Sequence, residues 1–120
     1  MVNVLLVEDH EDTRFVMSKL LTLCGHYVVV AGSFACAVQL LTHLKFDALV
    51  SDLGLPDQDG LGLPSVAKKY HPLKMSVALT ARSNDEDRQQ ARKAGFDHFM
   101  TKPFDFPRLR ALLSAEPESA

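Results

Sequence analysis

The chain has 120 residues, enough for one domain with a real core and too few for two. Its apolar fraction of 47% and charged fraction of 23% are those of a globular protein, and a net charge of −2 gives no basic field for nucleic acid. Neither a membrane span nor a signal peptide is visible, so we expect a cytoplasmic protein that binds neither nucleic acid nor membrane. Cys24 and Cys36 lack C-x-x-C spacing and are expected to be small buried hydrophobes.

Short apolar runs alternate with segments of helical period, which predicts five strand and helix units around a parallel sheet. The predicted strands cover residues 4–7, 27–31, 46–52, 75–80 and 98–101. A first predicted helix, at about 11–24, ends at Gly25. Ser33 is the expected N-cap of the second, whose sheet-facing positions are Ala37, Val38, Leu40, Leu41 and Leu44.

The remaining helices carry weaker signals. A third helix ends near Tyr70, with Pro64 tolerable only near its first turn, and Asp105 with Pro107 opens the last one. The segment from Asn84 to Ala94 is also prone to helix formation but offers almost no apolar stripe. Packing should hold this fourth helix less firmly than its neighbours, so we predict that it is the moving element.

The connections between the strands predict the architecture. Right-handed crossovers place helices on both faces of the sheet, giving an α/β fold, a three-layer doubly wound sheet of five parallel strands in the order 2-1-3-4-5. The first and third strands then flank the switch point, where such sheets present their chemistry. We expect residues 1–113 to form this domain and residues 114–120 to form a flexible tail.

Polar residues stand where the carboxyl ends of these strands meet. The set contains three carboxylates, a hydroxyl and an ammonium: Glu8, Asp9, Asp52, Thr80 and Lys102. Clustered carboxylates repel one another, so ionised acids here need a compensating cation, or the pKa of one of them would be raised. An all-oxygen site that must also admit phosphate oxygens suits Mg²⁺ and accepts Mn²⁺.

A metal-screened Asp52 is able to act as a nucleophile toward a phosphoryl donor and form an aspartyl phosphate. Phosphoryl transfer depends mostly on positioning and charge neutralisation. We therefore predict that Lys102 supplies positive charge to the phosphoryl oxygens and that Thr80 supplies a hydroxyl donor. Leu53 and Ala81, just past the strand ends, are expected to add backbone N–H groups.

The motifs at these strand ends resemble a known family. They are Leu-Val-Glu-Asp at 6–9, Ser-Asp-Leu-Gly-Leu-Pro at 51–56 with Asp-Gly at 59–60, Leu-Thr-Ala at 79–81 and Lys-Pro-Phe at 102–104. Each is weak alone, but together and in this order they make the chain similar to a response-regulator receiver domain of two-component signal transduction, over about residues 3–113. The resemblance implies a flavodoxin-like, CheY-like fold and a signalling domain instead of a turnover enzyme.

The resemblance also assigns roles at the acidic site. It implies that a histidine kinase or phosphotransfer protein donates phosphate to Asp52. It implies Mg²⁺ held by Asp9, Asp52 and the backbone carbonyl of Gly54, with Glu8 binding the ion through water. The bond between Lys102 and the proline after it is expected to be cis by similarity.

A switch and its partners follow from the same resemblance. Thr80 would shift toward the phosphoryl group and let Phe99 turn inward, which remodels the face built from the fourth helix, fifth strand and fifth helix. A downstream effector protein or domain would bind there, and the resemblance also allows a homodimer through that face. The chain is either a stand-alone regulator or part of a larger protein such as a hybrid kinase.

Some positions depart from the commonest family pattern. Glu8 stands where an Asp is frequent, and Phe99 lacks the hydroxyl of the Tyr found in many members. Gly54 and Arg82 occupy the positions two residues beyond Asp52 and Thr80, which influence how fast phosphate is lost in such domains. Gly54 also leaves room above the carboxylate for a phosphoryl group or a water.

Alternative interpretations stay open at this point. An aspartate-nucleophile phosphatase would usually have a second acid two residues after the nucleophile, where this chain has Gly54. A degenerate receiver would serve only as an interaction platform, although here every chemical position is filled. Phe99 also fits a plain core aromatic, and the five histidines share no metal-ligand spacing.

Overall fold

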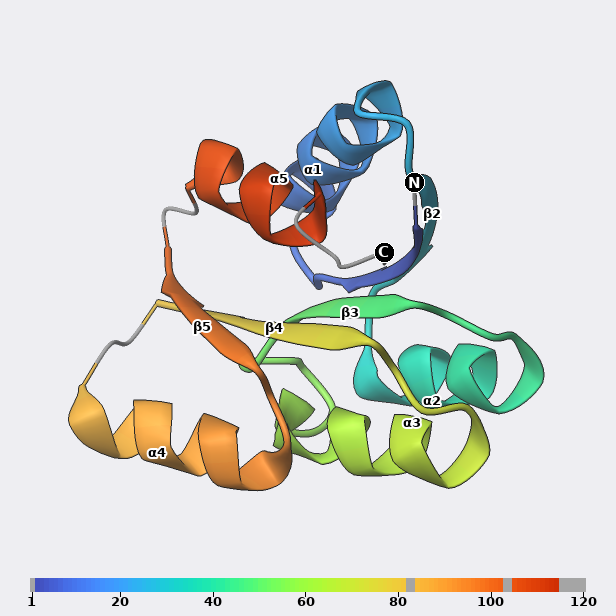
Figure 1. Cartoon of the computed structure of the whole chain (residues 1–120). Helices are drawn as coiled ribbons and strands as arrows, with labels where there is room; N and C mark the ends of the chain where they lie inside the picture. The colour runs from blue at the N-terminus through green and yellow to red at the C-terminus, as the bar shows by residue number, and fades with distance from the viewer. Residues whose placement is uncertain (1, 82–83, 103–104, 115–120) are drawn as a thin grey trace.

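Five parallel strands form one sheet in the structure, a computed structural model that describes residues 2–81, 84–102 and 105–114. The strands are β1 Asn3–Val7, β2 Tyr27–Ala31, β3 Ala48–Asp52, β4 Met75–Thr80 and β5 His98–Thr101. Their order is β2-β1-β3-β4-β5 (Figure 1), which confirms the predicted topology. In the register between β1 and β3, Val7 lies opposite Ser51, so the two strands end side by side.

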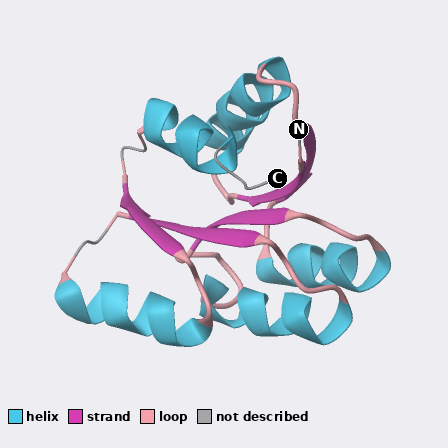
Figure 2. Ribbon diagram, viewed as in Figure 1, coloured by secondary structure: helices cyan, strands magenta, loops and turns pink. Residues whose placement is uncertain are grey.

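Helices cover both faces of this sheet. Helices α1 Glu11–Leu23 and α5 Phe106–Ser114 lie on one face, and α2 Phe34–His43, α3 Leu63–Tyr70 and α4 Asp85–Ala94 lie on the other (Figure 1). A short 3-10 turn, η1 Gly60–Gly62, precedes α3. Figure 2 shows the resulting three layers of helix, strand and helix, so the predicted α/β architecture is confirmed. Within the described residues, every helix is too short or too polar to cross a bilayer.

Alternate residues of the strands face two separate apolar cores. In β1, Leu5 and Val7 belong to the core that also holds α2 and α3 residues, whereas Val4 and Leu6 belong to the core shared with α1 and α5. The central strand β3 is buried along its whole length. A strand buried on both faces normally carries apolar residues throughout, so the carboxylate of Asp52 at its end is exceptional.

Local sequence signals set the helix ends largely as predicted. The Ser33 hydroxyl oxygen accepts the N–H of Cys36 at 3.1 Å and caps α2. Gly25 and Gly95 follow α1 and α4 with φ of 94° and 109°, a left-handed backbone that strains residues with a Cβ. Pro64 lies in the first turn of α3, where its missing N–H costs no hydrogen bond.

The burial expected for three side chains is wrong. Cys36 is exposed because Ala37 and Leu41 take the core-facing positions of α2, and Cys24 is only half-buried at the residue that follows α1. Both thiols are free, as expected. Leu44 is 45% exposed because it follows the last turn of α2 with an extended backbone and leaves the helical face. Ser114, predicted as the first tail residue, ends α5, and residues 115–120 lie outside the described part of the chain.

Candidate functional site

The end of β1 supplies a buried carboxylate and an exposed one. Glu8 is completely buried and Asp9 is exposed. The backbone of Glu8 is fixed twice, since its N–H donates to the Ala31 carbonyl at 3.0 Å and its own carbonyl accepts Arg14 Nη1 at 2.9 Å. Glu8 Oε2 accepts the backbone N–H of His10 at 3.0 Å. These contacts hold the side chain of Glu8 in one place beneath the site.

The neighbouring strand β3 supplies Asp52, of which 7% is exposed. Its Oδ1 accepts the backbone N–H of Gly54 at 3.0 Å, and its backbone carbonyl accepts the Ser51 hydroxyl at 2.9 Å. The N–H of Leu53 donates to the Leu79 carbonyl at 2.9 Å, which continues the pairing of β3 with β4. This differs from the predicted arrangement: sheet pairing engages the N–H of Leu53, and the N–H of Gly54 faces the carboxylate instead.

Lys102 reaches this acidic pair from the end of β5. Its backbone N–H donates to the Thr80 carbonyl at 2.7 Å, and its Nζ lies 2.8 Å from Asp52 Oδ2 and 2.9 Å from Glu8 Oε1. Burial lowers the pKa of Lys102, but its hydrogen bonds to Asp52 and Glu8 outweigh burial and raise that pKa overall. Lys102 therefore stays an ammonium and bridges two carboxylates from different strands.

The charges at this site do not balance among these residues. Carboxylate oxygens of Glu8, Asp9 and Asp52 all lie within 4.8 Å of one another, and the bridging ammonium of Lys102 neutralises only part of their charge. Oxygen ligands with an excess of negative charge suit a small hard cation such as Mg²⁺ or Mn²⁺. The donor set of this chain therefore fits the predicted metal.

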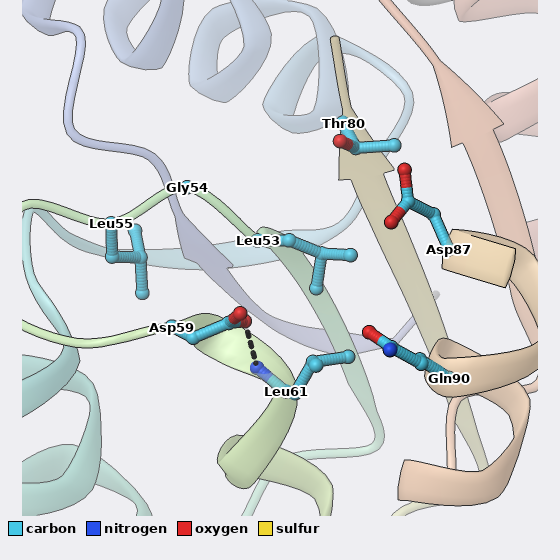
Figure 3. A pocket seen from close by; sticks show the side chains of 8 residues that line it. All are labelled: Leu53, Gly54, Leu55, Asp59, Leu61, Thr80, Asp87 and Gln90. Atoms are coloured by element: carbon cyan, nitrogen blue, oxygen red, sulfur yellow. Dashed lines mark hydrogen bonds between the residues drawn. The ribbon is translucent and has the colours of Figure 1, made fainter. Parts of the chain in front are cut away.

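A cavity of about 260 Å³ lies between the loop that follows Asp52 and helix α4. Its lining includes Gly54 and Thr80, and Figure 3 shows Asp87 of α4 close to the Thr80 side chain. Thr80 ends β4 and is buried. A Cβ built on Gly54 would meet only Asp52 Oδ1, at 3.8 Å, so no other side chain fills the space beside Gly54.

Contacts of the loop after β3 were not predicted. The carboxylate of Asp57 accepts the N–H groups of Phe34 and Ala35, both at 2.9 Å, and so ties this loop to the start of α2. A Cβ on Gly60 would lie 2.5 Å from the Asp52 carbonyl, so the loop closes against β3 only with glycine there. An Asp-Gly dipeptide such as the one at 59–60 is typical of a turn. Nothing local in the sequence identifies the helix that Asp57 caps, because that helix begins 23 residues earlier.

Phe99 and Ala81 complete the predicted set. Phe99 of β5 is buried, and the guanidinium carbon of Arg88 lies 4.9 Å from the centre of its ring. Ala81 is exposed just past β4. Arg82 and the proline after Lys102 fall outside the described residues, as does the expected cis bond.

Fold and site together define a class of proteins. Its members are doubly wound α/β domains that present acids, a hydroxyl and an ammonium at the switch point of the sheet. The family model of the response regulator receiver domain matches residues 4–114, and the chain belongs to this family. It is accordingly a domain of two-component phosphorelay signal transduction.

Individual proteins with similar sequences include a sensor protein and a transcriptional regulatory protein. The chain is 35% identical to the aerobic respiration control sensor protein ArcB of Escherichia coli, over 93% of this chain and 15% of that protein. It is 33% identical to the KDP operon transcriptional regulatory protein KdpE of the same species, over 94% of this chain and 50% of KdpE. The chain thus spans half or less of these two relatives.

A solved structure similar to this chain is the receiver domain of the sensor histidine kinase PA1611 from Pseudomonas aeruginosa. Its identity to this chain is 26% and its TM-score 0.84, with 96% of each chain covered. That receiver holds a magnesium ion in its active site cleft.

Proposed function

We propose that Asp52 is the phosphoacceptor of this receiver and that a histidine kinase or phosphotransfer protein donates the phosphoryl group. The observation that carries the proposal is the setting of the Asp52 carboxylate. One oxygen accepts a hydrogen bond from Lys102 and the other from the N–H of Gly54, and a cavity lined by Gly54 and Thr80 adjoins the loop that follows Asp52. A merely solvated carboxylate would need none of these partners.

Transfer joins one carboxylate oxygen of Asp52 to phosphorus while the bond from phosphorus to the donor breaks. The Lys102 ammonium stabilises the charge on the phosphoryl oxygens, and Thr80 with the N–H groups of Gly54 and Ala81 supplies further donors. Asp9, Asp52 and the Gly54 carbonyl would hold Mg²⁺, with Glu8 behind them, and the ion would supply charge neutralisation as the anionic donor approaches. The PA1611 receiver, which holds magnesium in its active site cleft, supports this assignment.

The phosphorylated state would then change the surface around β5. We infer that Thr80 moves toward the phosphoryl group and that Phe99 responds, since the two lie on neighbouring strands that pair through Thr80 and Thr101. A downstream effector would recognise the altered face of α4, β5 and α5. Because the phosphoryl group stays on Asp52 between these events, the domain acts as a switch and not as a turnover enzyme.

The direct test is incubation with Mg²⁺ and acetyl phosphate, followed by intact mass measurement. We expect one phosphoryl adduct, lost with Asp52→Asn and with a chelator. Asp12→Asn, an acid in the exposed first turn of α1, is the matched control and should keep the adduct.

Two results would contradict the proposal. No adduct from acetyl phosphate or from any kinase tried would indicate an interaction platform. Many turnovers of a phosphate ester would indicate a phosphatase.

A further inference from the structure

A basic groove lies at the outer edge of the sheet, where β5 has only β4 as a neighbour. It has a volume of about 210 Å³. The two helices that border it, α4 and α5, cover opposite faces of the sheet (Figure 1). Helix α4 contributes Arg88 and Arg92, and α5 contributes Arg108. We call the groove lined by these three side chains the arginine groove.

The positive charge of the arginine groove is not neutralised within the described part of the chain. All three arginines are exposed, and none of them takes part in an ion pair with another described residue. The one acid in the lining is Asp97, whose Oδ2 accepts the N–H of Ser76 at 2.9 Å. The arginine groove therefore presents guanidinium groups whose hydrogen-bonding capacity suits carboxylates.

The floor of the arginine groove is apolar. Phe96, Phe99 and Ala91 line it and are buried. The guanidinium of Arg88 lies over the Phe99 ring at 4.9 Å, a contact through the ring face that leaves the edge N–H groups of the guanidinium able to donate. A cationic rim above an aromatic floor matches a segment that carries both acidic and apolar side chains.

We propose that the arginine groove binds an acidic segment of a partner protein, with carboxylates on the arginines and an apolar side chain against Phe96 and Phe99. This proposal rests on the proposed function in one respect: it gives the chemistry of the effector expected at the face of α4, β5 and α5. Through the contact between Arg88 and Phe99, any movement of the ring changes the position of one carboxylate-binding group.

Two other occupants fit less well. A nucleic acid backbone running along α4 would meet the acids of its first turn, Asp85, Glu86 and Asp87, and the whole chain carries a net charge of −2. A second copy that docked groove to groove would have to offer acids to these arginines, and the lining of the groove holds one acid, Asp97, against three arginines.

The test uses fluorescence anisotropy with a labelled peptide of alternating glutamate and leucine, and a lysine and leucine peptide as its counterpart. We expect the unphosphorylated protein to bind the acidic peptide and not the basic one. Replacing the three arginines together (Arg88→Gln, Arg92→Gln, Arg108→Gln) should weaken binding by about tenfold or more, because charge pairs are lost. The matched control is Arg110→Gln, an exposed arginine of α5 outside the arginine groove.

When the acidic peptide is added, the amide signals that change position in a ¹⁵N correlation spectrum should be mainly those of α4, β5 and α5. Equal affinity of the triple variant, equal binding of the basic peptide, or tighter binding of a DNA duplex would overturn the proposal, as would a peptide-insensitive dimer through this face. Circular dichroism would verify that the triple variant is folded.

Repeating the titration after acetyl phosphate treatment separates this proposal from the proposed function. Peptide binding without any phosphoryl adduct would contradict the role of Asp52 and leave the arginine groove standing. An adduct without peptide binding in either state would support the role of Asp52 and contradict the proposal for the arginine groove.

Discussion

Helices α2 and α4 have the same length of ten residues and cover the same face of the sheet, yet they are held differently. Helix α2 buries Ala37 and Leu41 and packs Val38 and Leu40 against the core. Helix α4 buries only Ala91. The domain therefore has two parts that differ in packing. The firmly packed part positions the acids, and the loosely packed part borders the cavity and the arginine groove.

The largest effect is expected from a large-to-small substitution in the core beneath α2. Leu41→Ala should lower the free energy of unfolding by about 2–5 kcal/mol, since it removes a side chain that is almost fully buried. Ala91→Gly in α4 should cost only about 1 kcal/mol, mainly through helix propensity. Urea denaturation of both variants measures the difference, and equal losses would mean that α4 is packed as firmly as α2.

Hydrogen exchange addresses the same contrast without a substitution. Amides of α4 should exchange at least about tenfold faster than those of α2, which corresponds to an opening free energy lower by about 1.4 kcal/mol. The predicted mobility of α4 fails if its protection equals that of the core helices both with and without phosphate.

The helix caps give a smaller, matched pair of changes. Ser33 and Asn84 each accept a backbone N–H in the first turn, from Cys36 and Asp87 respectively. Ser33→Ala should cost about 1 kcal/mol of global stability. Asn84→Ala should instead fray α4 locally, so it should raise amide exchange there with little change in the urea midpoint. A global loss as large as that of Ser33→Ala would contradict the comparison.

The smallest effect concerns the acid that joins the site loop to α2. The N–H of Ala35 and then that of Phe34 lower the pKa of Asp57 from its ordinary value of 3.8. A lowered pKa in the folded state stabilises the fold above the ordinary value, and this contribution is lost as the pH falls through the folded value. Asp57→Asn should therefore make unfolding less steeply dependent on pH below about 4.

A matched control for this pH dependence is Asp12→Asn, an acid of the first turn of α1. Thermal melts across that pH range measure the slope for wild type and both variants. A slope in Asp57→Asn identical to that of wild type would show that the loop contact does not couple to protonation.

Sequence reasoning succeeded where the signal was periodic or local. The apolar runs predicted the five strands, and the right-handed connections between them predicted their order. Ser33 and Gly25 marked helix ends because their roles depend only on neighbouring backbone. The sequence also predicted that three side chains would meet, because the carboxyl ends of parallel strands lie at one edge of the sheet. These side chains are Glu8, Asp52 and Lys102.

Other features depended on contacts that the sequence does not encode locally. The cap by Asp57 on α2 and the contact of Arg88 with Phe99 join segments through the tertiary fold. The exposure of Cys36 followed from which face of α2 turned inward, a choice fixed by Ala37 and Leu41. The N–H of Leu53, expected to face a phosphoryl group, donates to the Leu79 carbonyl in this structure because strand pairing extends one residue beyond Asp52.

The bridge made by Lys102 joins residues that are synthesised at very different times. Its ammonium joins Glu8, which lies 94 residues earlier, and Asp52, which lies 50 residues earlier. During synthesis the two acids therefore emerge long before their counterion, and a nascent chain that stops short of β5 would hold a repelling acidic cluster. The ability to accept phosphate proposed for Asp52 should thus appear only when nearly the whole domain has been made.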